Sequence, residues 1–120
     1  MTMSARVTSA FWMSAYVRRV FVEGAFAAVV RRGSEEAGAI FVIVDRLDGT
    51  ADLYSQAPQS AFGDQRPRDR LFMRVMEAAE RPDLSKRIES ELRFDPDLWL
   101  VEIEERTGRS FLETIDPDKL

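Results

Sequence analysis

Apolar residues near the start of the chain recur at the spacing of one helix face. They are Met13, Tyr16, Val17 and Val20. Intervals of three and four residues place side chains on one stripe of an α-helix. Thr8 or Ser9 can cap the first turn, and Gly24 favours a stop after about Glu23. The pattern therefore predicts an amphipathic first helix that ends at this glycine.

A second helical stripe lies in the carboxy-terminal half of the chain. Leu84, Ile88 and Leu92 are spaced by four residues, and Asp83 stands where an N-cap is expected. The residue before a proline disfavours helical geometry, so this helix must end before Pro96.

The segments between the two helices favour β-structure. Residues 25–32 and 38–47 are rich in β-branched and aromatic side chains, and a short polar connection separates them. This predicts two paired antiparallel strands. The dipeptide at 48–49, Asp-Gly, is a hairpin signal that leads into a third strand at 50–55. The three strands would form a meander.

A polar stretch and a fourth strand follow. Residues 56–70 contain two prolines, a glycine and many polar groups, which is typical of a loop. Residues 70–77 then place Leu71, Met73 and Val75 on one face, as a half-buried strand does.

The stretch DLWLVEIEERTGRSF, residues 97–111, predicts a hairpin. A three-residue loop at 106–108, with Gly108 in the left-handed conformation, pairs apolar with apolar residues and opposite charges with each other. The pairs in that register are Glu105 with Arg109, Ile103 with Phe111, and Trp99 with Ile115. A two-residue Thr-Gly loop would place Glu102 opposite Glu113, so the first register is preferred.

Together these elements predict an α+β fold, an antiparallel sheet of five or six strands with two helices packed on one face. We expect residues 1–120 to form a single domain, ordered over about residues 9–115, because the length suits one core and no linker or repeat interrupts it.

The composition excludes several kinds of chemistry. The chain has no cysteine and no histidine. Zinc sites built on these residues, thiol catalysis, iron–sulfur clusters and Ser-His-Asp relays are therefore ruled out. No cofactor is indicated. No apolar run reaches the roughly 20 residues of a membrane span, and polar interruptions in the first 19 residues argue against a signal peptide, so we expect a cytoplasmic protein with no membrane partner.

The charge distribution argues against nucleic-acid binding. The formal net charge is −4: residues 83–120 carry a net charge of −5, and residues 1–82 carry +1. A general nucleic-acid binder needs a basic footprint, so we expect no nucleic-acid partner.

Two carboxylates in the predicted hairpin form a candidate metal site. Glu102 and Glu104 share one strand face, and the rise of a strand places them about 7 Å apart. With a third ligand, such as Asp95 or Asp97, they could hold Mg²⁺ or Ca²⁺ in a carboxylate-dependent hydrolase. Solvent-facing glutamates on an antiparallel strand explain the same pattern.

Two arginine pairs form a candidate anion site. Arg18 and Arg19 lie in the first predicted helix, and Arg31 and Arg32 at the end of the following strand. Counting rises from Gly24 leaves the pairs roughly 14 Å apart along a shared axis. A small-anion site at one pair, an intersubunit site combining both, and ordinary solvated arginines all remain open.

Several stretches together resemble a known family. They are WMSAYVRR, EGAFAAVVRRG, AGAIFVIVDRLDGT, QAPQSAF and RFDPDLWLVEIEERTGRSFL. Over residues 12–112 the chain is similar to the short alphaproteobacterial proteins classed as domain of unknown function 1491. The resemblance implies a bacterial, cytoplasmic, single-domain protein and carries no activity, cofactor or site residue.

The absence of a catalytic constellation favours a non-enzymatic binding or protein-interaction domain. Phe21 and Val22 fall off the stripe of the first helix, so either this end is extended or the helix has a second apolar face. A second face would suit a homodimer. The metal-dependent hydrolase and a sensor of small anionic ligands that uses the arginine pairs are the alternatives.

Overall fold

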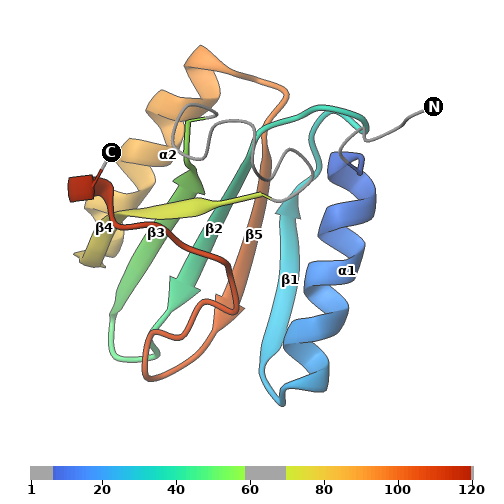
Figure 1. Ribbon diagram of the computed structural model, residues 1–120. Helices are drawn as coiled ribbons and strands as arrows, with labels where there is room; N and C mark the ends of the chain where they lie inside the picture. The colour runs from blue at the N-terminus through green and yellow to red at the C-terminus, as the bar shows by residue number, and fades with distance from the viewer. Residues whose placement is uncertain (1–6, 59–69, 120) are drawn as a thin grey trace.

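The computed structural model describes residues 7–58 and 70–119 as helices, strands and connections around one sheet (Figure 1). The elements are α1 (Ser9–Val22), β1 (Phe26–Arg31), β2 (Ile40–Asp45), β3 (Thr50–Gln56), β4 (Phe72–Glu80), α2 (Arg81–Phe94), β5 (Trp99–Glu104) and the 3₁₀ turn η2 (Pro117–Lys119). Most of the predicted loop at 56–70, and the first six residues of the chain, lie outside the described residues. Within the described ranges, no helix is long and apolar enough to cross a membrane.

The five strands form one mixed sheet in the order β1-β5-β2-β3-β4 (Figure 1). Neighbouring strands are antiparallel except β2 and β5, which run parallel. The α+β class and the strand number agree with the sequence prediction, and the parallel pair is the one departure from a fully antiparallel sheet.

The predicted pairing of residues 25–32 with 38–47 is wrong, because β5 lies between them. Ile103 of β5 is opposite Ala27 of β1 on one side and Val44 of β2 on the other. The strand is almost continuously buried from Trp99 to Ile103, as a central strand is. The antiparallel meander is instead formed by β2, β3 and β4.

The predicted hairpin at 97–111 is wrong for the same reason. Both edges of β5 are occupied, so the segment after it has no free edge to join. That segment runs on to β4, where the Phe72 amide donates to the Glu113 carbonyl and the Ile115 amide donates to the Phe72 carbonyl, both at 2.9 Å. The left-handed Gly108, at φ +86°, is confirmed, but it turns the chain away from β5.

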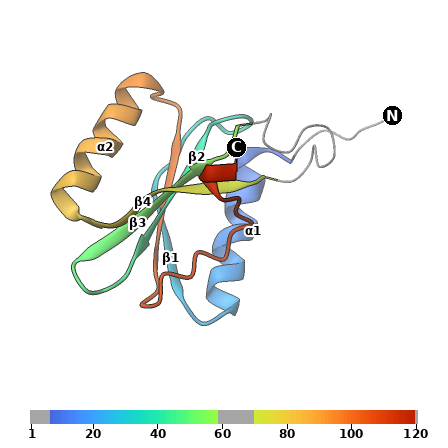
Figure 2. The same ribbon diagram turned by 60° about the vertical axis from the view of Figure 1, so that its left-hand side comes forward.

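The two helices cover opposite faces of the sheet, not the single face predicted (Figure 2). The core beneath α1 contains its Met13, Tyr16 and Val20 with Ile40, Val42 and Val44 of β2. The core beneath α2 contains its Leu84 with Ile43, Leu53, Leu98 and Leu100. Because consecutive residues of β2 point to opposite faces, its unbroken apolar run supplies both cores.

The ends of the helices follow the predicted chemistry with one change. The Phe11 amide donates to the Thr8 hydroxyl at 3.1 Å, which confirms this N-cap, and Gly24 follows α1 at φ +92°. Helix α2 begins earlier than predicted: its N-cap is Glu80, which makes no capping bond with its side chain. Asp83 is therefore not the cap but an acidic residue in the first turn, where it faces the positive end of the helix dipole.

The connection between β1 and β2 fits closely around the chain that leads into β5. A Cβ atom at Gly33 would lie 2.1 Å from the backbone oxygen of Asp97, and one at Gly38 would lie 2.5 Å from the same oxygen. The Ser34 amide donates to that oxygen at 2.8 Å. These two glycines are thus required for close backbone contact.

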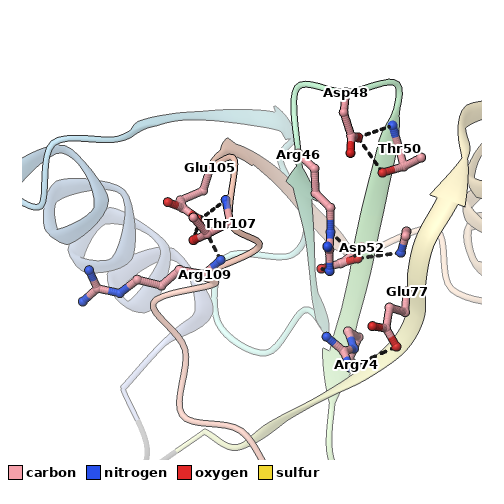
Figure 3. A network of polar contacts seen from close by, with 10 residues as sticks. Arg46, Asp48, Thr50, Asp52, Arg74, Glu77, Glu105, Thr107 and Arg109 are labelled. Atoms are coloured by element: carbon pink, nitrogen blue, oxygen red, sulfur yellow. Dashed lines mark hydrogen bonds and ion pairs between the residues drawn. The ribbon is translucent and has the colours of Figure 1, made fainter.

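A buried ion pair joins β2, β3 and β4 (Figure 3). The Asp52 carboxylate is fully buried and accepts hydrogen bonds from Arg46 Nε at 3.1 Å and Nη2 at 2.8 Å. It also accepts a bond at 2.7 Å from the amide of Ala78, a residue at φ +48° beside the irregular pairing of β3 with β4. The carboxylate therefore fixes the bulge between these strands.

Two turns on the same side of the molecule are held by carboxylates (Figure 3). Asp48 accepts bonds from the hydroxyl and amide of Thr50, and these bonds lower the pKa of Asp48. Burial tends to raise the pKa of Glu105, but bonds from Thr107 and from the Arg109 amide outweigh it and lower the pKa. Both carboxylates are thus bound most strongly in their charged form.

Candidate binding site at helix α1 and strand β1

Strand β1 is an edge of the sheet that no other strand covers in the described part of the chain. It pairs with β5 on one side only. The opposite edge of the sheet differs, because Thr114 forms a bridge with Phe72 of β4. The exposed backbone edge of β1 is therefore the surface on which another strand could pair.

Apolar side chains are exposed on this strand and on the helix beside it. On β1 the exposed members are Phe26, Ala28, Val29 and Val30, and on α1 they are Phe11, Phe21 and Val22. Phe21 and Phe26 meet edge to face with their ring centroids 5.7 Å apart, which joins the helix end to the strand. Val22 is 78% exposed and Val30 is 56% exposed. Phe21, Phe26, Ala28, Val29 and Val30 thus form an exposed apolar group at the edge, and such grouped exposure marks an interaction site. Phe11 and Val22 instead line a separate hollow on α1 with Arg18 and Arg19.

The structure separates Arg31 from Arg32, whereas Arg18 and Arg19 both line a hollow of about 460 Å³ on α1. Arg19 donates to the Phe111 carbonyl at 2.9 Å, and Arg31 donates to the Pro96 carbonyl at 2.6 Å, so both hold the backbone of later segments. Arg18 and Arg32, one member of each pair, instead line a common hollow between α1 and β1.

The candidate metal ligands are only partly free to bind a cation. Arg81 at the start of α2 contacts Glu102 at 2.8 Å and Asp45 at 3.1 Å, and the hydrogen bond that it donates to Glu102 raises the pKa of Arg81. Glu104 is exposed on the same strand face. The Asp95 carboxylate accepts a bond from the Asp97 amide at 3.0 Å and so shapes a turn. Within residues 7–58 and 70–119, no group of three or more acidic side chains could hold a metal ion. The metal site stays a prediction.

A larger hollow, which the sequence did not indicate, lies on the other flank of α1. Its volume is about 590 Å³, and it is lined by Trp12, Arg19, Glu23, Arg70 and residues 109–113. The Tyr16 hydroxyl donates to the Ser110 carbonyl at 2.7 Å beside it, and burial raises the pKa of Tyr16. The sequence does not predict this hollow, because the segment after β5 has the pattern of a hairpin. No local signal indicates that this segment crosses to α1.

The comparisons with known proteins agree with this fold. A crystal structure of a DUF1491 family protein from Caulobacter crescentus is 39% identical, covers 91% of this chain and 97% of its own, and gives a TM-score of 0.73. A solution structure of a protein from A. tumefaciens is 42% identical, covers 92% of this chain and 96% of its own, and gives a TM-score of 0.80. No curated protein matches. The family model described as protein of unknown function, DUF1491, matches residues 7–113, and the chain belongs to this family.

Proposed function

We propose that this protein is a non-enzymatic interaction domain that binds a second copy of itself through the edge of β1. The observation that carries the proposal is the uncovered, apolar edge strand. Residues 26–30 contain no charged side chain, no proline and no glycine. Exposed edges of this kind promote pairing with another chain, and soluble proteins usually protect them with charge, proline or a covering segment.

A second copy suits this edge because the strand is complementary to itself. Two β1 strands paired antiparallel about a twofold axis place the beginning of each beside the end of the other. Glu23 precedes the strand, whereas Arg31 and Arg32 end and follow it. Antiparallel pairing centred on Ala28 places Glu23 of each copy opposite Gly33 of the other, one residue beyond Arg32, so opposite charges lie near each other at both ends. Parallel pairing would bring arginine beside arginine.

The apolar side chains beside the edge would extend the contact. Phe26 and Val30 are half exposed, and Phe21 packs against Phe26 from the end of α1. In a paired sheet these side chains would leave water together, and burial of apolar area is the main driving force of association.

The groups with shifted pKa values also favour a binding role. Burial raises the pKa of Tyr16, while hydrogen bonds account for the shifts of Arg46, Asp48, Arg81 and Glu105. Each is explained by a contact that stabilises the fold. Shifted groups in an enzyme usually converge on one cleft, whereas these five lie in α1, at the start of α2 and in the turns that follow β2 and β5.

Analytical ultracentrifugation of the wild type and of Ala28→Lys tests the proposal. Ala28 is exposed in the middle of β1, so a lysine there brings two like charges together in the antiparallel pair. We expect a dimer for the wild type at micromolar concentration and a monomer for the variant. Ser90→Lys, which adds the same charge on the exposed side of α2, should remain dimeric.

Circular dichroism and melting of all three proteins establish that they fold alike. A wild type that sediments as a monomer throughout the micromolar range would refute the proposal. So would Ala28→Lys dimerising as strongly as the wild type, because the contact would then not use this edge.

A further inference from the structure

The geometry points to a binding site for a small organic anion in the hollow between α1 and β1, with Arg18 and Arg32 as its anion-binding groups. The hollow has a volume of about 310 Å³. Sites for small molecules typically measure about 300–1,000 Å³, so this one suits a compact ligand. All the residues that line it belong to one copy of the chain, so the site does not require dimerisation.

The charge of the hollow is entirely positive. Its lining includes both arginines and no acidic residue. Among the described residues, neither Arg18 nor Arg32 forms an ion pair. Other arginines do, for example Arg46, Arg74, Arg81, Arg87 and Arg109. Two uncompensated guanidinium groups on one hollow, in a chain of net charge −4, select for an anionic ligand.

The guanidinium of Arg32 is held in place by an aromatic ring. It lies 4.8 Å from the ring centroid of Trp99, a distance that permits a cation–π contact. Trp99 is buried, and its indole Nε1 donates to the Ser34 carbonyl at 2.7 Å. The indole is thus fixed, and an arginine ordered on it loses less conformational freedom when a ligand binds.

The remaining walls indicate the body of the ligand. Met13, Val17 and Val29 line the hollow together with Trp99, and the Ser14 hydroxyl adds one polar group. An inorganic ion would leave these apolar walls unused. A ligand that suits both the arginines and the apolar walls is a carboxylate or a phosphate monoester on a short apolar body. Carboxylates and phosphates each offer the paired oxygens that a guanidinium binds.

The larger hollow on the other flank of α1 is less suited to an anion. Glu23 and Glu113 line it together with its arginines. Arg109 is also 3.5 Å from Glu23, and Arg19 donates to the Phe111 carbonyl. A ligand carboxylate or phosphate there would meet two like charges and arginines that are already engaged.

Titrations followed by ¹H–¹⁵N NMR test the inference, with n-butyl phosphate and butyrate as probes. We expect saturable shifts centred on the Trp99 indole N–H and the Val29 amide. Inorganic phosphate should bind at least about tenfold more weakly than butyl phosphate, because it lacks the apolar body. Butanol, which lacks the charge, should produce no saturable shift.

Variants locate the site. Arg18→Gln and Arg32→Gln should each weaken butyl phosphate binding about tenfold or more, as loss of a charge-assisted contact does. Arg93→Gln is the matched control, because Arg93 is exposed on α2 and also forms no ion pair within the described residues. It should bind like the wild type.

Three results would overturn the inference. They are a lack of saturation by both organic anions at millimolar concentration, unchanged affinity in the Arg18 and Arg32 variants, and saturation only by an acidic peptide. Ala28 points to the face of β1 opposite Val29. A protein carrying Ala28→Lys should therefore keep the anion site, so that loss of the dimer and loss of the ligand are separately visible.

Discussion

Replacing Asp52 by asparagine removes the charge at the centre of the buried network while keeping the shape of the side chain. The carboxylate is fully buried and accepts three hydrogen bonds, two from Arg46 and one from the Ala78 amide. An asparagine has one acceptor oxygen and an NH₂ group that would point at a donor. At least one of the three bonds is lost, and Arg46 keeps only the more distant charges of Glu77 and Asp48.

The expected loss of unfolding free energy is about 3 kcal/mol. Breaking a buried ion pair from one side costs about 3–5 kcal/mol. The Arg46 side chain is 22% exposed, so its cation regains some hydration, which places the value at the lower end. Urea unfolding measures it: the midpoint should fall while the m-value stays constant.

Glu77→Gln is the matched control. Glu77 contacts Arg74 at 3.2 Å, but the side chains are 64% and 40% exposed. The same loss of a carboxylate charge from an arginine pair should cost less than about 1 kcal/mol here. Equal effects of the two substitutions, or a cost below about 1 kcal/mol for Asp52→Asn, would refute the argument from burial.

Four further substitutions test other contacts. Gly33→Ala should cost about 3 kcal/mol in urea unfolding, because its Cβ would overlap backbone atoms of residues 97 and 98, whereas Gly24→Ala, which meets nothing within 4 Å, should cost only the roughly 1–2 kcal/mol of left-handed strain. Tyr16→Phe should cost about 1–3 kcal/mol by leaving the buried Ser110 carbonyl unpaired. Burial raises the pKa of Tyr16, so the stability that its neutral phenol contributes is complete below the pKa of the unfolded chain, near 10. That stability is lost as the pH rises toward the pKa of the folded protein. The free energy of unfolding should therefore fall above about pH 10, and less steeply in the variant. Glu105→Gln should destabilise the turn at neutral pH. Because folding lowers the pKa of Glu105, the stability contributed by its carboxylate is present above the pKa of the unfolded chain, near 4.3, and is lost below it. Acid unfolding that is the same in the variant and the wild type would contradict this direction.

The elements could be predicted from the sequence wherever the signal is local. The Thr8 cap, the stop at Gly24 and the stripe of α1 depend on neighbouring residues, and each was found where it was expected. The turn at Asp48 and Gly49 likewise depends on local chemistry.

The order of the strands could not be predicted, because it depends on contacts between distant segments. The alternation of Val101 and Ile103 with Glu102 and Glu104 is typical of a strand with one face in water. β5 is nevertheless a central strand, and Glu102 can lie there because its carboxylate forms an ion pair with Arg81 of α2. The residues next to Glu102 do not predict this ion pair, because Arg81 lies 21 positions earlier in the sequence.

The candidate site was predictable in its residue types but not in its grouping. Distances counted along the helix and the strand place the pair Arg18 and Arg19 far from the pair Arg31 and Arg32. The structure instead places Arg18 and Arg32 on one hollow, because α1 folds back beside β1 and long side chains reach across the gap. The exposed edge of β1 required the strand order and was beyond the sequence.

The position of β5 has a consequence for how the chain folds during its synthesis. β5 is made after β1, β2, β3 and β4, yet it occupies the place between β1 and β2. Until residues 99–104 emerge, β1 has no neighbour, and β2 lacks the partner that fills one of its sides. The amino-terminal segments must therefore remain open, with apolar strand edges accessible to chaperones, until a strand made more than fifty residues later closes the sheet.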